Sequence, residues 1–191
     1  DGWVKRFIEK PTSMENNLVL IGCYWFKNAE RLHAAIEEQM ERKISLKGEY
    51  YLADTISVMI EGGAKVRTHN GISWLDAGTI EATLDTNKVL LDKLGKQVNT
   101  YTGRQVKVIE PCAIDPSAEI SDSTIGPHAS IGADCKIENS TITESIVEAG
   151  SEIKDAALSR SMVGRQAQVR GRGDGHVVQL NVGDNSYVIL S

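Results

Sequence analysis

Residues 114–142, I-D-P-S-A-E-I-S-D-S-T-I-G-P-H-A-S-I-G-A-D-C-K-I-E-N-S-T-I, decide the fold because an aliphatic residue returns in them every five or six positions. Neither the 3.6-residue period of a helix nor the two-residue alternation of an antiparallel strand gives this spacing. A hexapeptide β-helix does, since each short strand and its corner form one side of a three-sided coil. The repeat extends through Val108, Ile114, Ile120, Ile125, Ile131, Ile137, Ile142, Val147, Ile153, Leu158, Val163 and Val169.

These anchors predict a left-handed parallel β-helix over residues 106–191, with about four coils at three anchors per turn. The anchor side chain should point into the prism, and the residue four places after it should be small to fit the corner. Ile146 and Met162 do not fit this rule. Residues 171–176, G-R-G-D-G-H, read as a loop, and residues 177–190 read as one or two capping strands.

Residues 1–95 show a different pattern, in which strand-like and helix-like segments alternate. Residues 4–8, 18–26 and 64–74 read as strands, and residues 52–60 and 80–94 as helices. A further helix is indicated by an apolar stripe at Leu32, Ile36, Met40 and Ile44. This order predicts an α/β domain with a largely buried sheet. Residues 96–105 are polar and turn-rich, and we interpret them as a linker.

Composition narrows the class of protein. The net charge is −5, from 26 acidic and 21 basic residues, which argues against a nucleic-acid or anionic-membrane partner. No apolar run approaches the roughly 20 residues that cross a bilayer. Three cysteines lie in unrelated contexts without a C-x-x-C pair, as in a cytoplasmic protein with reduced thiols.

Three short motifs contain candidate functional residues. Glu9-Lys10-Pro11 ends the first expected strand, and Gly22 interrupts the second, where glycine marks either close approach of a ligand or a packing bulge. Residues 47–54, K-G-E-Y-Y-L-A-D, open an expected helix, and Glu49 there could serve only the helix dipole. Asp76, in W-L-D-A-G-T, follows a strand and precedes a helix N-cap, so it could bind Mg²⁺ or simply form a turn.

Taken in order, the motifs E-K-P, N-x-x-x-x-G-x-Y, G-E-x-x-x-x-D and W-x-D-x-G-T, followed by hexapeptide repeats, resemble sugar-phosphate nucleotidyltransferases. Within that family the chain is most similar to the long form of glucose-1-phosphate thymidylyltransferase, including the ending L-N-V-G-D-N-S-Y-V. The resemblance implies the C-terminal, sugar-binding half of a Rossmann-like catalytic domain at residues 1–95, followed by the β-helix.

The resemblance also implies site roles. The catalytic residues would be Lys10, which contacts the sugar phosphate, and Asp76, which holds the catalytic Mg²⁺. The other substrate-binding residues would be Glu9 on sugar hydroxyls, Leu20 and Gly22 through their backbone, Trp74 against the sugar, and Lys47. Lys47 stands where thymidylyltransferases carry an arginine that grips phosphate, and it keeps the charge without the bidentate fork.

The implied reaction joins a nucleoside triphosphate and a sugar 1-phosphate into a nucleotide sugar and pyrophosphate, with glucose 1-phosphate and dTTP as the expected pair. A sugar-phosphate oxygen attacks the α-phosphorus in line, and Mg²⁺ and lysine neutralise the charge. The family's G-x-G-T-R-L nucleotide loop is absent from this sequence. We therefore expect the base-recognising half to precede Asp1 and the chain alone to be inactive.

Two alternatives fit the repeats. Hexapeptide acyltransferases use a histidine as general base, and His128 and His176 are the histidines in or after the repeats; both read as exposed and inert. The chain could also be a non-catalytic scaffold or regulatory subunit. In every case the flat outer faces of such a helix suggest a homo-oligomer, with a trimer expected.

Overall fold

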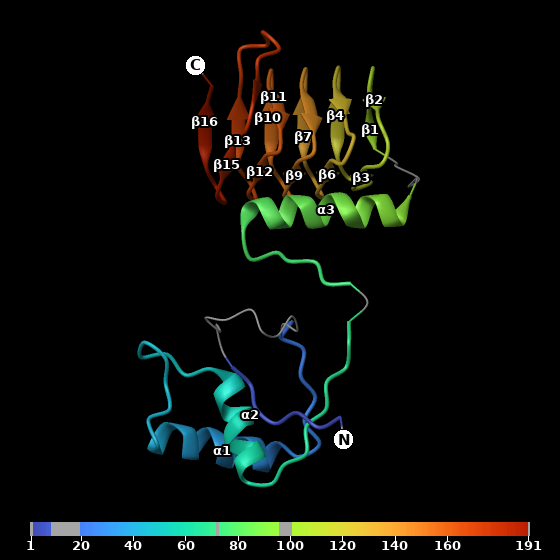
Figure 1. The fold of residues 1–191 in the computed structure, drawn as a ribbon. Coiled ribbons are helices and arrows are strands. Elements are labelled where there is room, and N and C mark those ends of the chain that lie inside the picture. The colour runs from blue at the N-terminus through green and yellow to red at the C-terminus, as the bar shows by residue number, and fades with distance from the viewer. Residues whose placement is uncertain (1, 9–19, 72, 96–100, 191) are drawn as a thin grey trace. The chain divides into compact units, whose positions relative to one another are not determined.

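The protein is represented by a computed structural model that describes residues 2–8, 20–71, 73–95 and 101–190 (Figure 1). The chain divides into two compact units, Asp1–Trp74 and Leu75–Ser191. The helix at Ile80–Leu94 falls in the second unit with the repeats, whereas the sequence places it with the N-terminal domain. Each unit is described by itself below.

The first unit contains two helices, α1 (Ala29–Glu41) and α2 (Leu52–Glu61). Asn28 caps α1 by accepting a hydrogen bond from the backbone N–H of Arg31, and α2 ends at Gly62 as expected. The buried side of α1 is formed by Ala35 and Gln39, while Met40, expected in the apolar stripe, is exposed. The expected stripe is therefore wrong at its C-terminal end. Met40 lies on the exposed side of the helix, and Ile44 lies three residues beyond the last helical residue, Glu41.

Gln39 is a polar residue at the contact between the two helices, and it is almost completely buried. Its side-chain nitrogen donates to the carbonyls of Ile44 at 3.1 Å and Tyr51 at 3.2 Å. Its side-chain oxygen accepts the hydroxyl of Thr55 on α2. A buried amide with both ends paired avoids the cost of an unsatisfied polar group, so Gln39 links α1 to α2 without destabilising either.

The strands expected at 4–8, 18–26 and 64–74 are not present as paired strands in the described parts of these ranges. Residues 18, 19 and 72 lie outside the described residues. The segments at 4–8 and 64–74 are joined by a backbone hydrogen bond from Val4 N to Val66 O at 2.9 Å, which does not by itself make a β-ladder. β-favouring side chains are not sufficient for a strand, because a strand also needs a neighbour for its N–H and C=O groups. Trp25 accordingly remains 83% exposed.

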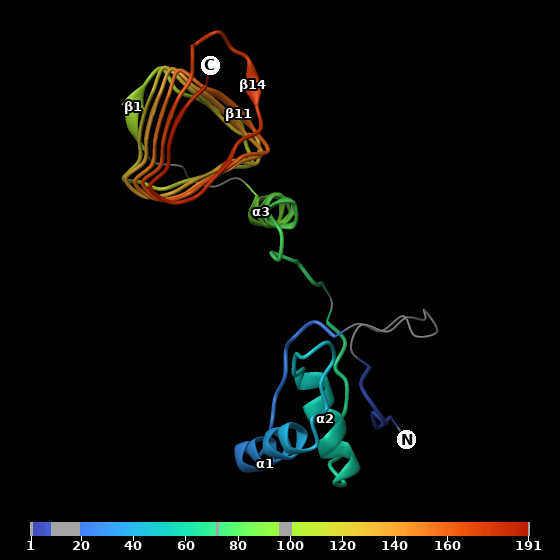
Figure 2. The same cartoon turned by 90° about the vertical axis from the view of Figure 1, so that its left-hand side faces the viewer.

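The second unit is a helix, α3 (Ile80–Leu94), and a parallel β-solenoid whose three-sided outline is seen in Figure 2. Within residues 101–190 all strand pairs are parallel, and the strands form three sheets ordered β1-β4-β7-β10-β13-β16, β14-β11-β8-β5-β2 and β15-β12-β9-β6-β3. The strands are β1 (Thr102–Arg104), β2 (Lys107–Val108), β3 (Ala113–Ile114), β4 (Glu119–Ser121), β5 (Thr124–Ile125), β6 (Ser130–Ile131), β7 (Lys136–Glu138), β8 (Thr141–Thr143), β9 (Ile146–Val147), β10 (Glu152–Lys154), β11 (Ala157–Ser159), β12 (Met162–Val163), β13 (Gln168–Arg170), β14 (Val177–Val178), β15 (Asn181–Val182) and β16 (Tyr187–Ile189).

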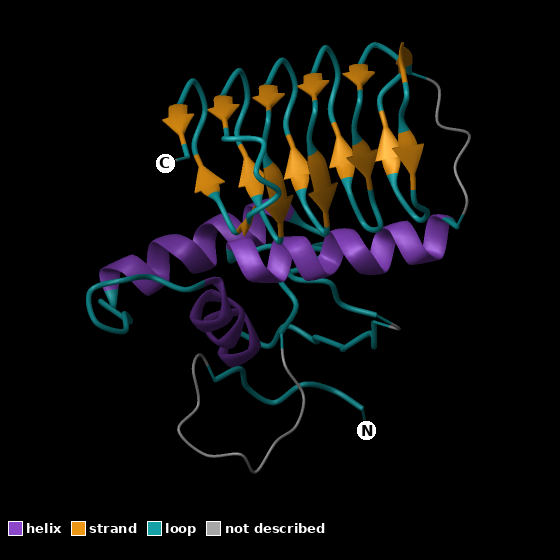
Figure 3. Cartoon of the chain, turned by 90° about the horizontal axis from the view of Figure 1, so that it is seen from above, coloured by secondary structure: helices purple, strands orange, loops and turns teal. Residues whose placement is uncertain are grey.

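Consecutive strands lie on different sides of the solenoid, and every third strand pairs with its equivalent in the next coil (Figure 3). This arrangement confirms the hexapeptide β-helix and is consistent with the left-handed form. The sheet of six strands gives about five turns rather than about four. The extra length comes from β1, which lies inside the expected linker 96–105, and from β14, β15 and β16, which each extend one side.

The core of the solenoid is a set of stacked aliphatic columns. Ile120, Ile137, Ile153 and Val169 occupy equivalent positions in neighbouring strands of one sheet and are at most 2% exposed. Burying each branched side chain against its equivalent contributes about 1.5–3 kcal/mol relative to leaving it in water. The anchors predicted from the sequence are thus the core of the solenoid.

The sequence rule gives the wrong position for the small corner residue wherever two anchors are five residues apart. It lies two residues before the following anchor, not four residues after the preceding one, and the two counts differ whenever the step is five residues long. Ile146 and Met162 are therefore no exceptions, since each is the outward residue of a strand, just before its anchor. The buried corner residues are all small: Cys112, Ala118, Ser123, Ala129, Cys135, Ser140, Ser145, Ser151, Ala156, Ser161 and Ala167.

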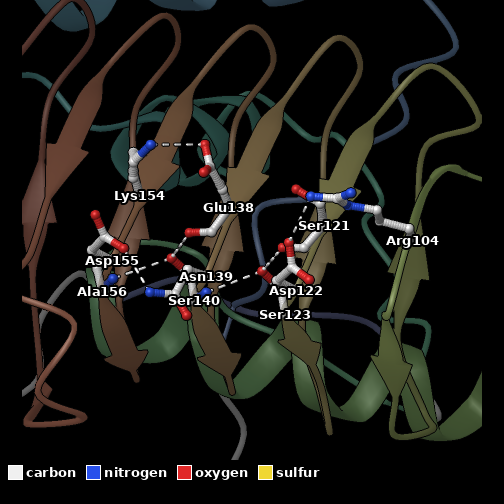
Figure 4. Close-up of polar contacts among 10 residues, drawn as sticks. All are labelled: Arg104, Ser121, Asp122, Ser123, Glu138, Asn139, Ser140, Lys154, Asp155 and Ala156. Atoms are coloured by element: carbon white, nitrogen blue, oxygen red, sulfur yellow. Dashed lines mark hydrogen bonds and ion pairs between the residues drawn. The ribbon is translucent and has the colours of Figure 1, made fainter.

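Serine predominates at the five-residue corners, where its hydroxyl substitutes for backbone pairing (Figure 4). The Ser123 hydroxyl donates to the carbonyl of Ser121 at 2.6 Å and accepts the N–H of Ser140 in the next coil at 3.0 Å. Ser140 repeats the arrangement by accepting the N–H of Ala156 at 3.1 Å. Each such hydroxyl satisfies a backbone N–H that the shortened corner would leave buried without an acceptor.

Cys23, Cys112 and Cys135 form no disulfide in the described structure. Cys23 is exposed, whereas Cys112 and Cys135 are buried corner residues of the solenoid. Burial raises the pKa of the Cys135 thiol above its ordinary value. In the described part of the chain, no helix has both the length and the apolar character needed to span a bilayer.

Candidate functional site

The described candidate residues of the first unit are Leu20, Gly22, Lys47 and Trp74, and all four are exposed. Glu9 and Lys10 lie outside the described residues. Leu20 is 42% exposed, and Gly22 has a φ of +74° with open space where a Cβ would be. The glycine is therefore required by its backbone conformation, since a side chain there would meet no neighbouring atom. The pocket that these residues are expected to line stays a prediction.

Lys47 lies at the tip of a tight turn. Leu46 and Glu49 exchange two backbone hydrogen bonds of 2.9 and 3.0 Å, and Lys47 and Gly48 between them have φ values of 53° and 83°. Positive φ at both central residues defines a type I′ turn, which presents the lysine to solvent. The helix expected to open within residues 47–54 therefore begins only at Leu52, so Lys47 and Glu49 precede α2 and are not in its first turn. A charged side chain on such a tip is free to meet a phosphate.

Trp74 is the last residue of the first unit, and its side chain is 58% exposed. Exposed indole rings provide flat apolar surfaces on which a sugar ring can pack. The role expected for Trp74 is compatible with this exposure and remains a prediction.

Asp76 lies in the loop that enters α3. Its Oδ1 accepts the backbone N–H of Gly78 at 3.0 Å, and its carbonyl accepts the hydroxyl of Thr86 at 2.5 Å. Thr79 caps the helix by accepting the N–H of Ala82 at 3.1 Å, as the sequence predicts. These side-chain hydrogen bonds fix the conformation of the loop, and the Asp76 carboxylate is exposed to solvent.

The Asp76 carboxylate fits a magnesium ion by its chemistry. Mg²⁺ prefers oxygen ligands and commonly takes one or two carboxylates from the protein, completing its shell with substrate phosphates and water. An exposed carboxylate held by a backbone N–H can supply one such ligand. The described residues contain no cluster of three or more His, Cys, Asp or Glu side chains, so phosphate oxygens and water would have to provide most of the shell.

The helix that follows this loop is attached to one corner of the solenoid by a row of polar contacts. Asp92 contacts His128 at 2.8 Å, and Lys88 contacts Glu144 at 3.6 Å. Arg160 lies between Asp85 at 3.2 Å and Glu81 at 3.5 Å. Leu84 and Leu91 on the same helix are buried. The loop with Asp76 is therefore anchored, through α3, to the solenoid.

His128 differs from the exposed, inert residue that the sequence suggests. Its side chain is 15% exposed, Nε2 contacts Asp92, and Nδ1 is buried without a hydrogen-bond partner in the described part of the structure. Asn87 donates to the His128 carbonyl at 3.3 Å and accepts the hydroxyl of Ser130 at 2.6 Å. The chain's own helix therefore covers the histidine that an acyltransferase would need open. His176 is exposed, as expected.

Sequence reasoning missed the contacts of α3 with the solenoid. A signal for them exists in the charges at Asp85, Lys88 and Asp92, which recur every three to four residues on one side of the helix. Each has an opposite charge or a histidine on the corner of a successive coil. The match becomes visible only when the residues that follow β5, β8 and β11 are aligned with one another. The five-residue steps obscure that alignment in the sequence.

Comparison with known proteins finds a family match in the first part of the chain. Residues 1–93 match the family model described as nucleotidyl transferase. Residues 1–93 are thus similar in sequence to nucleotidyl transferases, and residues 101–190 form a parallel β-solenoid, in the order that the motifs predict.

Particular relatives cover both parts. A glucose-1-phosphate thymidylyltransferase of Streptomyces griseus is 28% identical over 100% of this chain and 58% of its own length. One of Streptomyces antibioticus is 30% identical over 88% of this chain and 51% of its own length. The bifunctional protein GlmU of an Exiguobacterium species is 30% identical over 88% of this chain and 40% of its own length. The chain thus spans about half the length of these two thymidylyltransferases.

Proposed function

We propose that this chain is the sugar-binding part of a sugar-1-phosphate nucleotidyltransferase that acts on glucose 1-phosphate and dTTP. The observation that carries the proposal is the similarity to a glucose-1-phosphate thymidylyltransferase over the whole chain, through both the nucleotidyl transferase sequence and the solenoid. The order of the short motifs from Glu9 to Thr79 supports the same assignment.

In the proposed reaction the chain's residues bind and orient. Lys10 meets the sugar phosphate, Glu9 accepts hydrogen bonds from sugar hydroxyls, and the backbone at Leu20 and Gly22 lines the sugar site. Asp76 supplies a carboxylate to Mg²⁺, which when bound neutralises charge that develops on the phosphates. Lys47 adds a positive charge for phosphate, and Trp74 an apolar surface for the sugar ring. No covalent intermediate is needed, because positioning and charge neutralisation carry this class of transfer.

The sugar site is tested by titrating the chain with glucose 1-phosphate in an isothermal calorimeter. We expect saturable binding that falls by about tenfold or more in Lys10→Ala, since losing a charge-assisted hydrogen bond costs about 1.5–3 kcal/mol. Lys5→Ala is the matched control, an exposed lysine five residues away, and should bind as the parent does. Equal affinity in all three proteins would rule out the proposed role of Lys10.

Two finer expectations belong to this proposal. Because the sequence lacks the G-x-G-T-R-L loop, the chain alone should release no pyrophosphate from dTTP and glucose 1-phosphate, and measurable release would overturn this. Assembly into a homo-trimer through the solenoid is also a prediction. Light scattering should give three times the chain mass of 20.8 kDa, and a monomeric mass would contradict it.

A further inference from the structure

We propose that Arg160, which directly follows strand β11 of the solenoid, is a positioning residue for the loop that carries Asp76, and so sets the affinity of that carboxylate for a divalent cation. The inference rests on the proposed function, because it takes Asp76 as the metal-binding residue. It assigns to the solenoid a part in the reaction that neither the nucleotidyl transferase sequence nor the solenoid fold implies by itself.

The first link joins the loop to the helix. The hydroxyl of Thr86 donates to the carbonyl of Asp76 at 2.5 Å, and the hydroxyl of Thr83 donates to the carbonyls of Ala77 at 3.3 Å and Thr79 at 2.9 Å. Both threonines lie in the first two turns of α3. The conformation of the loop therefore depends on those two turns remaining helical, and helix ends fray unless something holds them.

The second link joins those turns to the solenoid. Arg160 contacts Glu81 and Asp85, which bracket Thr83 and precede Thr86. The hydrogen bond to Asp85 raises the pKa of the Arg160 guanidinium, so the group stays positively charged. The other polar contacts of α3 with the solenoid described above involve Asn87, Lys88 and Asp92, which lie farther along the helix. Arg160 is thus placed to hold the end of the helix nearest the loop.

The geometry of the two elements explains why the contacts stay in register. A helix advances about 1.5 Å per residue, so the average spacing of three to four residues between its contacts covers about 5 Å. Neighbouring parallel strands are about 4.8 Å apart, which is the advance from one coil to the next. Arg160, Glu144 and His128, which lie in equivalent turns of successive coils, can therefore each meet one turn of α3. Figure 1 shows α3 lying along the row of coils. A shift of the helix by one turn would place Asp85 near Glu144, a like charge.

The expected size of the effect is modest because the pairs are exposed. Arg160 is 36% exposed, and Glu81 and Asp85 more so, which allows solvent to screen the attraction. Exposed ion pairs change an equilibrium by about two- to fivefold when removed. We expect Arg160→Ala to weaken Mn²⁺ binding at Asp76 by that factor, and the difference to shrink at high salt.

The experiment uses the whole chain and two readouts. Amide hydrogen exchange at Gly78 and Ala82, whose N–H groups bond to Asp76 and Thr79, reports the loop without any metal. Mn²⁺ titration in the presence of glucose 1-phosphate, whose phosphate can complete the metal shell, is followed by electron paramagnetic resonance and reports the carboxylate. Asp76→Asn is the reference for loss of the site. Arg160→Ala and Asp85→Asn should both speed exchange by about two- to fivefold and weaken Mn²⁺ binding equally.

Arg165→Ala is the matched control, because Arg165 is an arginine of the solenoid that pairs with Glu148 at 3.7 Å, away from α3. It should leave both readouts unchanged. Unchanged exchange at Gly78 and Ala82 in Arg160→Ala and Asp85→Asn would overturn the positioning role, whatever the metal does. Faster exchange in the two variants, together with Mn²⁺ binding that Asp76→Asn does not reduce, would instead overturn the metal role of Asp76 on which the proposal depends.

Discussion

The serine corners of the solenoid allow a stability prediction to be worked out atom by atom at Ser145. Its side chain is fully buried, its hydroxyl donates to the Thr143 carbonyl at 2.6 Å, and it accepts the Ser161 N–H at 2.9 Å. In Ser145→Ala the Thr143 carbonyl keeps a second donor, the N–H of Arg160 at 3.3 Å. The N–H of Ser161 loses its acceptor and remains buried.

One unsatisfied buried N–H costs about 1–3 kcal/mol, so the free energy of unfolding of the solenoid should fall by that amount. The assay is urea denaturation followed by far-ultraviolet circular dichroism. Tryptophan fluorescence is unsuitable, since Trp3, Trp25 and Trp74 all lie in the first unit. The slope of free energy against urea should not change, because the variant exposes the same surface on unfolding.

Thr141→Ala is the control, as Thr141 is an exposed residue one strand earlier, and its replacement should change the free energy by no more than about 0.5 kcal/mol. If Ser145→Ala and Thr141→Ala unfold at the same urea concentration, the hydroxyl does not stabilise the corner. The account of why serine occupies the short corners would then be wrong.

Three further predictions concern the solenoid and the cysteines. Ile142→Ala removes a fully buried anchor and should lower the free energy of unfolding by about 2–5 kcal/mol in the same urea assay; a loss below 1 kcal/mol, as for an exposed site, would show that the anchor column does not carry the core. In the folded protein a thiol reagent should label exposed Cys23 long before Cys135, whose pKa is raised by burial, and equal rates would contradict the buried corner. Hydrogen bonds from Ser117 lower the pKa of Asp115 in the folded state. Its contribution to stability is therefore present above the unfolded value of about 3.9 and is lost as pH falls through the lower folded value. Asp115→Asn should lower the melting temperature at pH 7, and the difference from the parent should shrink as the pH is lowered below about 3.9.

The solenoid was predictable from sequence because each anchor fills an equivalent position, so a single spacing repeats through the chain. The corner rule failed at Ile146 and Met162 because five-residue steps shift a forward count by one position. The hydrogen bonds of Ser145 and its equivalents link residues in different coils, and a linear sequence shows such neighbours only after the coils are aligned.

Residues 1–95 were less predictable than the solenoid for a different physical reason. The helix limits at Gly62, Thr79 and Gly95 follow from local capping, which depends on a few neighbouring residues. The expected strands depend on partners elsewhere, and the described segments pair only at Val4 and Val66. The candidate site shares this difficulty. The turn at Lys47 is local, while the contact of Arg160 with Asp85, on the helix that follows Asp76, is tertiary.

The central claim, a sugar-phosphate site in the first unit of a chain that ends in a solenoid, is tested most directly by nuclear magnetic resonance of the amide-labelled chain during a glucose 1-phosphate titration. The account predicts saturable shifts of signals from residues 8–24, including Lys10 and Gly22, with the signals of residues 106–169 unmoved. Shifts confined to the solenoid, or no shift at millimolar ligand, would contradict it.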